Sequence, residues 1–168
     1  MDYYIADTHF DDENILIYSR PQFKSVKEMN ELIIKNWIDT VKSDEDTVWH
    51  LGDVGNCEYL KDLPGKKIII LGNHDNEEEI RKTLPGAKIY DMPIIDRFLF
   101  LSHKPIEFLP KEIPYLNIHG HLHQYDYRMT DGLNWYKGNR YFNASCEKIG
   151  FKPISALDIM KKIGYKKT

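Results

Sequence analysis

The hydrophobic positions in the first half of the chain follow two different periods. Short apolar runs at 2–7, 47–51 and 66–71 have the length and composition of strands, and the last is continuous, as in a strand buried on both faces. Over 25–42 the apolar residues instead recur at steps of three and four, which predicts a helix, and Ser25 with Glu28 forms a capping box at its start. Shorter helices are expected at 57–63 and 76–84, each stopped by a Pro-Gly pair.

The second half is predicted to be mostly strand. The expected strands lie at 88–95, 98–102, 116–119, 141–145 and 153–159. No repeat, low-complexity tract or linker interrupts the chain. A β-α-β-α-β beginning followed by further strands predicts one α/β domain over residues 1–168, with sheets covered by helices.

Composition and charge narrow the classes of protein that fit. The chain has 168 residues, about the length of one domain, and 42% of them are apolar and 29% charged, as in a globular protein. The net charge of −3 disfavours a general nucleic-acid or membrane-surface binder. No apolar stretch approaches the roughly 20 residues of a membrane span, and the first residues lack a signal peptide. We therefore expect a cytoplasmic protein with no membrane partner, in which Cys57 and Cys146 are reduced and partly buried.

Most of the seven histidines lie beside acids and glycines at the ends of predicted strands, and this placement indicates a functional site. Ligands of α/β proteins bind at the carboxyl ends of strands. Residues two apart on an extended chain, such as Asp7 and His9 or His121 and His123, should point to the same side. The five segments concerned are Asp7-Thr8-His9, Gly52-Asp53, Gly72-Asn73-His74-Asp75, His103 and Gly120-His121-Leu122-His123.

These segments supply a set of oxygen and nitrogen donors that suits divalent metals. Seven ligands are too many for one tetrahedral ion but suffice for two ions that share a carboxylate. The predicted ligands are Asp7, His9, Asp53, Asn73, His103, His121 and His123. Manganese is our first expectation for both ions, and iron, zinc or nickel also fit. Two such ions together with Asp7, Asp53 and a bridging hydroxide carry about one net positive charge, which attracts an anionic substrate. Two metal ions about 3.5–4 Å apart serve in-line attack on phosphorus.

Each segment has an ordinary alternative when taken alone. The segment 72–75 has the residues of a turn, and 120–123 has those of a strand edge with solvated imidazoles. All five occur in order, each at a predicted strand end, and this combination argues against coincidence.

The same segments resemble the pattern of the calcineurin-like metallophosphoesterases, over nearly the whole chain. The stretch from Thr8 to Phe23 is similar to a compact bacterial and phage branch of that family. The resemblance implies a four-layer α-β-β-α sandwich with a two-metal site between the sheets. By position it implies that one metal is held by Asp7, His9 and His123, the other by Asn73, His103 and His121, and that Asp53 bridges them. It also implies that His74 is no ligand and faces the scissile phosphate.

This chain departs from that branch at Asp11 and Asp12, where relatives tend to have Gly-His. A carboxylate there would repel a phosphate or adjust a metal-bound water, so the departure puts the substrate in doubt.

Several other residues are candidates for supporting roles. An imidazole such as His74 can protonate a leaving alkoxide near neutral pH, and Asp75 either orients it or caps the next helix. Arg20 is predicted to clamp a phosphate, with a solvated loop arginine as the alternative. His50 is expected to be a core histidine. The aromatic residues of the loop Gln124–Lys137 either stack on a nucleobase or pack a long hairpin.

Together these observations predict a dinuclear metal-dependent phosphohydrolase. We expect attack by a metal-bridging hydroxide and assistance to the leaving group by His74. The family resemblance and the compact chain further imply a preference for phosphodiesters of small or nucleotide-like molecules. A phosphomonoesterase and a catalytically weak metal-binding scaffold of the same fold are the alternatives. The expected partner is a small phosphate ester, while the oligomeric state stays open.

Overall fold

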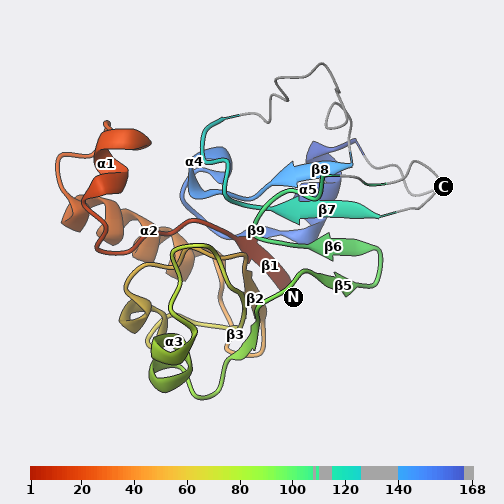
Figure 1. The fold of residues 1–168 in the computed structure, drawn as a ribbon, viewed down its shortest axis with the longest axis horizontal. Coiled ribbons are helices and arrows are strands. Elements are labelled where there is room, and N and C mark those ends of the chain that lie inside the picture. The colour runs from red at the N-terminus through yellow and green to blue at the C-terminus, as the bar shows by residue number, and fades with distance from the viewer. Residues whose placement is uncertain (108, 110–114, 126–139, 165–168) are drawn as a thin grey trace.

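Two β-sheets form the framework of the computed structural model, which describes residues 1–107, 109, 115–125 and 140–164. The first sheet has the strand order β4-β3-β2-β1-β9 and the second has the order β5-β6-β7-β8 (Figure 1). The first comprises β1 (Asp2–Ile5), β2 (Thr47–His50), β3 (Lys66–Ile70), β4 (Lys88–Tyr90) and β9 (Ile154–Ser155). The second comprises β5 (Ile94–Asp96), β6 (Leu99–Leu101), β7 (Leu116–His119) and β8 (Tyr141–Asn143).

Most neighbouring strands are parallel, so their carboxyl ends lie at one edge of each sheet. Strands β1 to β4 are parallel to their neighbours, as are β6, β7 and β8, while β9 and β5 are antiparallel additions. Just beyond β1, Ala6 forms an isolated parallel bridge with Ser145. The ends of the two sheets therefore meet where β1 gives way to the first predicted ligand segment.

Helices flank the sheets. In Figure 1 the first sheet lies between α1, α2 and α3 on the left and strands β5 to β8 on the right. The helical elements are α1 (Asn14–Tyr18), α2 (Val26–Thr40), the 3₁₀ turn η1 (Cys57–Leu60), α3 (Glu77–Thr83), α4 (Cys146–Ile149) and α5 (Ala156–Lys162). Helix α2 begins as predicted, with the Ser25 hydroxyl accepting from the Glu28 N–H, and it buries Met29, Ile33 and Trp37. The mixed α/β class is confirmed, with two sheets and flanking helices as a metallophosphoesterase sandwich requires.

Three expected elements differ from the structure. The expected strand at 88–95 is wrong, because Asp91-Met92-Pro93 separates β4 from β5, which belong to different sheets. The expected strand at 153–159 is also wrong: only Ile154–Ser155 is extended, and Ser155 then caps α5 by accepting from the Asp158 N–H. The run at 66–71 is a strand buried only toward its end, at Ile69 and Ile70.

Two further expectations concern the thiols and the membrane. Cys57 and Cys146 are both buried and unpaired by a disulfide. Within the part of the chain that the structure describes, no helix combines the length and apolarity that crossing a bilayer requires.

Candidate metal centre

The structure brings the predicted ligands together as two compact groups. Asp7, His9 and His123 form the first group, and Asp53, His103 and His121 form the second. Within each group, one donor atom from every residue lies within 4.8 Å of the others. Each group draws residues from both sheets, since the segments after β1 and β2 face those after β6 and β7.

The backbone reaches this arrangement through left-handed turns rather than extended strands. Positive φ angles occur at Asp7 (55°), His9 (47°), Asp53 (55°), His121 (69°) and His123 (49°). We expected an extended chain from Asp7 to His9 and from His121 to His123. That expectation is wrong, although the side chains do converge. Non-glycine residues in this region cost about 1 kcal/mol or more each, and such strain gathers at functional sites.

Two of the glycines beside the ligands are required by close approach. A Cβ atom on Gly72 would overlap the Asp53 carboxylate and backbone nitrogen. A Cβ atom on Gly120 would overlap the Ala6 side chain and a carboxylate oxygen of Asp7. Any larger residue at either position would displace a predicted ligand.

Asp53 belongs to the second group but also lies close to the first. Its Oδ2 is 3.7 Å from His9 Nε2 in the first group and 3.4 Å from His103 Nε2 in the second. Around the same His103 nitrogen lie Asn73 Oδ1 at 3.0 Å and His121 Nδ1 at 3.2 Å. The side chains thus supply a carboxylate with access to both groups and an amide oxygen for the second.

The unfilled hydrogen-bonding capacity of these side chains fits a bound cation. The His103 Nδ1 must donate to the Leu51 carbonyl at 2.9 Å, which leaves its Nε2 as a lone-pair donor when the ring is neutral. His9 Nε2 is buried and has no hydrogen-bond partner among the described residues. Burial raises the pKa of Asp7 to about 6 and lowers that of His9 to about 4. Oxygen and neutral imidazole donors in a buried cluster are the ligands that divalent transition metals use.

The outer nitrogens of the first-group histidines face carboxylates that are not predicted ligands. His9 Nδ1 is 3.1 Å from Asp12 Oδ2, and His123 Nδ1 is 3.1 Å from Glu147 Oε1. Burial alone would raise the pKa of Glu147, but bonds from His123 and Arg20 hold it at about 2. Glu147 lies 24 residues from His123, and the sequence offered no signal that would connect them.

The structure corrects the expectation for Arg20. Its side chain is fully buried, and its guanidinium donates to Glu147 Oε1 at 2.7 Å, to the Thr8 carbonyl at 2.9 Å and to the Asp7 carbonyl. Because these acceptors occupy the buried guanidinium, Arg20 supports the backbone of Asp7 and Thr8 and has no exposed edge with which to hold a phosphate.

His74 and Asp75 follow the same strand but have different environments. His74 is exposed, belongs to neither ligand group, and its ring centroid lies 5.7 Å from that of His9. Asp75 accepts backbone N–H groups of Asp53, Val54 and Gly72, each at 2.8 Å. Asn76, not Asp75, caps α3, so neither role expected for Asp75 is observed.

A buried hydrogen-bonded chain supports the segment between Asp7 and His9. The Thr8 hydroxyl donates to the Val54 carbonyl at 2.8 Å and therefore accepts from His50 Nε2 at 2.9 Å. His50 is a core histidine as predicted, although its Nδ1 has no partner among the described residues. Burial lowers the pKa of His50 to about 4.

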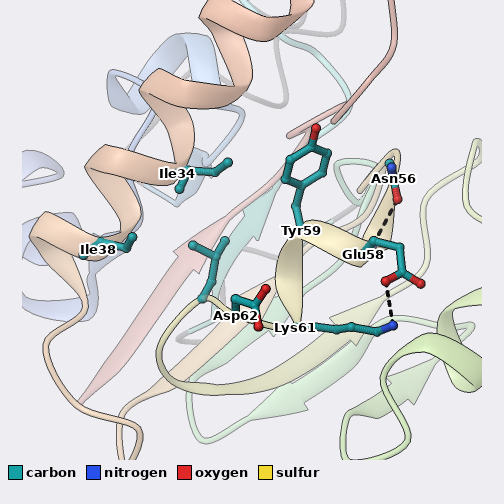
Figure 2. A pocket seen from close by; sticks show the side chains of 8 residues that line it. Ile34, Ile38, Asn56, Glu58, Tyr59, Lys61 and Asp62 are labelled. Carbon is teal, nitrogen blue, oxygen red and sulfur yellow. Dashed lines mark hydrogen bonds and ion pairs between the residues drawn. The ribbon is translucent and has the colours of Figure 1, made fainter.

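A groove of about 400 Å³ lies between α2 and η1 (Figure 2), and two of the residues that line it bond to Asp11. Asn56 and Tyr59, which line this groove, donate to the Asp11 carboxylate at 2.7 and 3.0 Å, and Asn30 donates at 2.7 Å. Asp11 has a φ of 62°. Three uncharged donors therefore satisfy this carboxylate. Within the described residues it bonds to no ligand histidine, whereas its neighbour Asp12 bonds to His9. Most of the aromatic loop 124–137, from residue 126 onward, lies outside the described residues.

Comparisons with known proteins agree with this geometry. A family model, the calcineurin-like phosphoesterase superfamily domain, matches residues 3–144. The chain is 32% identical to the uncharacterised protein MJ1445 of Methanocaldococcus jannaschii, over 96% of this chain and 89% of that protein. A crystal structure of AQ665 of Aquifex aeolicus, a protein of unknown function, is 33% identical and superposes with a TM-score of 0.70, covering 97% of this chain and 99% of its own. The Gene 66 protein of Mycobacterium phage L5 is 30% identical over 48% of this chain and 42% of its own length.

Proposed function

We propose a hydrolytic function from one premise: the chain belongs to the calcineurin-like phosphoesterase superfamily. On that premise the protein is a phosphohydrolase that depends on two divalent metal ions. The observation that supports this proposal is the position of Asp53, whose carboxylate lies between the His9 and His103 nitrogens and so links the two ligand groups.

The proposed ligand assignment follows the two groups. Asp7, His9 and His123 would hold one ion, His103, His121 and Asn73 the other, and Asp53 both. When bound, the two ions would polarise phosphate oxygens and lower the pKa of an attacking water. Manganese is the proposed native ion, and iron, zinc or nickel fit the same oxygen and imidazole donors.

His74 is the proposed proton donor to the leaving group. It is exposed beside the ligand groups, and its backbone N–H donates to Asp53 Oδ1 at 2.9 Å, which ties the position of the residue to that of the bridge. Its imidazole can therefore approach a phosphate ester from the solvent side while remaining free of both ligand groups.

Charge at the site favours a phosphodiester over a monoester. Four carboxylates belong to the groups or bond to their histidines, namely Asp7, Asp53, Asp12 and Glu147, and one guanidinium, Arg20, bonds to Glu147. Two divalent ions and the bridging hydroxide would leave this set with no net charge. A monoanionic diester would add one negative charge to it, whereas a dianionic monoester would add two and screen its own phosphorus from attack.

Hydrolysis of matched aryl esters tests this proposal. The Mn²⁺-loaded protein should hydrolyse bis-(4-nitrophenyl) phosphate with a higher kcat/KM than 4-nitrophenyl phosphate. A monoester value at least tenfold higher would favour the phosphomonoesterase alternative. A protein that binds two ions and hydrolyses neither ester would favour the scaffold alternative.

A further inference from the structure

The two ligand groups differ in the hydrogen-bond partners of their histidine rings. In the first group, both Nδ1 atoms face carboxylates, those of Asp12 and Glu147, at 3.1 Å each. In the second group, His103 Nδ1 faces a neutral backbone carbonyl, that of Leu51. The described residues place no carboxylate within hydrogen-bond distance of the His121 ring.

Each of the two carboxylates is itself fixed in place. The second oxygen of Asp12 accepts the backbone N–H of Asn14 at 2.9 Å, at the start of α1. Glu147 Oε1 accepts from the buried guanidinium of Arg20 at 2.7 Å. Both carboxylates are therefore oriented toward their histidines by contacts outside the ligand groups.

We propose that Asp12 and Glu147 are positioning residues that hold His9 and His123 with Nδ1–H outward and Nε2 toward the metal, and so make the first group the tighter of the two metal positions. A carboxylate that accepts the outer N–H of a ligating imidazole sets its tautomer and raises the basicity of the coordinating nitrogen. The unpartnered Nε2 of His9 is the nitrogen that this arrangement leaves for coordination.

Asp12 is the more informative of the two residues to change. Its side chain is 31% exposed, so its replacement leaves no charge buried without a partner, whereas removing the Glu147 charge would strand the buried Arg20. Asp11 provides a matched control, because Asp11→Asn makes the same chemical change one residue away, in a carboxylate that bonds to Asn30, Asn56 and Tyr59 instead. Asparagine also tolerates the positive φ at that position.

The experiment measures metal retention in the full-length, Mn²⁺-loaded protein. Wild type, Asp12→Asn and Asp11→Asn are equilibrated against chelator-buffered series of free Mn²⁺, and bound metal is counted by atomic emission. We expect two classes of site in wild type. Asp12→Asn should weaken the tighter class about tenfold to a hundredfold, the usual effect of losing such a partner, and leave the weaker class within about twofold. Asp11→Asn should change neither class by more than about twofold.

A spectroscopic measurement separates positioning from a general loss of structure. In the diamagnetic Zn²⁺-loaded protein, the His9 ring N–H proton should resonate far downfield, and Asp12→Asn should move it upfield while the His123 signal stays in place. Glu147→Gln should show the converse pattern if it folds, and the Asp12 arm decides the question alone if it does not.

The inference depends on the proposed function only in treating the two groups as metal positions. Equal weakening of both classes, equal effects of the Asp11 and Asp12 variants, or no effect of Asp12→Asn would overturn it, as would wild type that binds no Mn²⁺. If wild type binds two ions asymmetrically but hydrolyses no phosphate ester, the proposed function fails and this inference stands.

Discussion

Replacing Asp75 by asparagine should destabilise the protein by about 2–3 kcal/mol. The Asp75 Oδ2 accepts the N–H groups of Asp53 and Gly72, and Oδ1 accepts that of Val54, all at 2.8 Å. In its better orientation an asparagine keeps the first two bonds but turns an amide N–H toward Val54. Hydrogen bonds to charged groups contribute about 1.5–3 kcal/mol each, and Asp75 is half-buried, so water compensates only part of the loss.

Urea unfolding followed by tryptophan fluorescence measures this change. Chelator in every sample keeps metal release out of the free energy of unfolding. The control is Asp91→Asn, the same change in an exposed carboxylate without a hydrogen-bond partner among the described residues. It should stay within about 0.5 kcal/mol of wild type, as ordinary surface substitutions do. If Asp75→Asn also stays within that margin, the three bonds do not hold the Asp53 segment against the segment after β3.

Four further substitutions test the centre and its support. Asp53→Asn keeps the shape of the bridge but removes its charge, so Mn²⁺ content and turnover should fall together; two bound ions with near-normal rates would show that the bridge is misplaced. His74→Ala should retain two ions and lose about 10²–10⁴ in kcat, most for a diester whose leaving alcohol has a high pKa, whereas His121→Ala should lose metal and slow all diesters alike; an equal loss on both kinds of diester would contradict the role of His74 as acid. Burial lowers the pKa of His50 to about 4, below the unfolded value of about 6.5, so the unfolded state binds the extra proton first and stability is lost as pH falls between these values. In chelator, His50→Gln should reduce that loss by up to about 3 kcal/mol, and an unchanged slope of unfolding free energy against pH would refute the assignment.

Local patterns predicted the elements whose signals are contained within them. Helix α2 combines a regular apolar stripe with a capping residue, and β1, β2 and β3 are short apolar runs between turn residues. At 153–159 the apolar content resembled a strand, but Ser155 with Asp158 formed a helix cap that outweighed it. At 88–95 the break at Pro93 was local, whereas the assignment of its two sides to different sheets depends on tertiary packing.

The ligand groups were predictable for a related reason, and their supports were not. The ends of parallel strands in one sheet must meet at its edge, so Asp7 and Asp53, which follow β1 and β2, could be expected to converge from their places in the chain alone. The contact between Glu147 and His123 joins segments that follow different strands. Arg20, which also bonds to Glu147, looks like a loop arginine in the sequence until its burial is known. Burial and long-range pairing are properties of the folded chain, and no single stretch of sequence encodes them.

The division of each ligand group between the two sheets links metal occupancy to the cooperativity of folding. In the first group Asp7 and His9 follow β1 while His123 follows β7, and in the second Asp53 follows β2 while His103 and His121 follow β6 and β7. An ion bound to either group would act as a cross-link between the two halves of the molecule. Since ligands that bind only the native state stabilise it by mass action, metal-loaded protein would unfold as one unit, and separating the sheets would require releasing both ions.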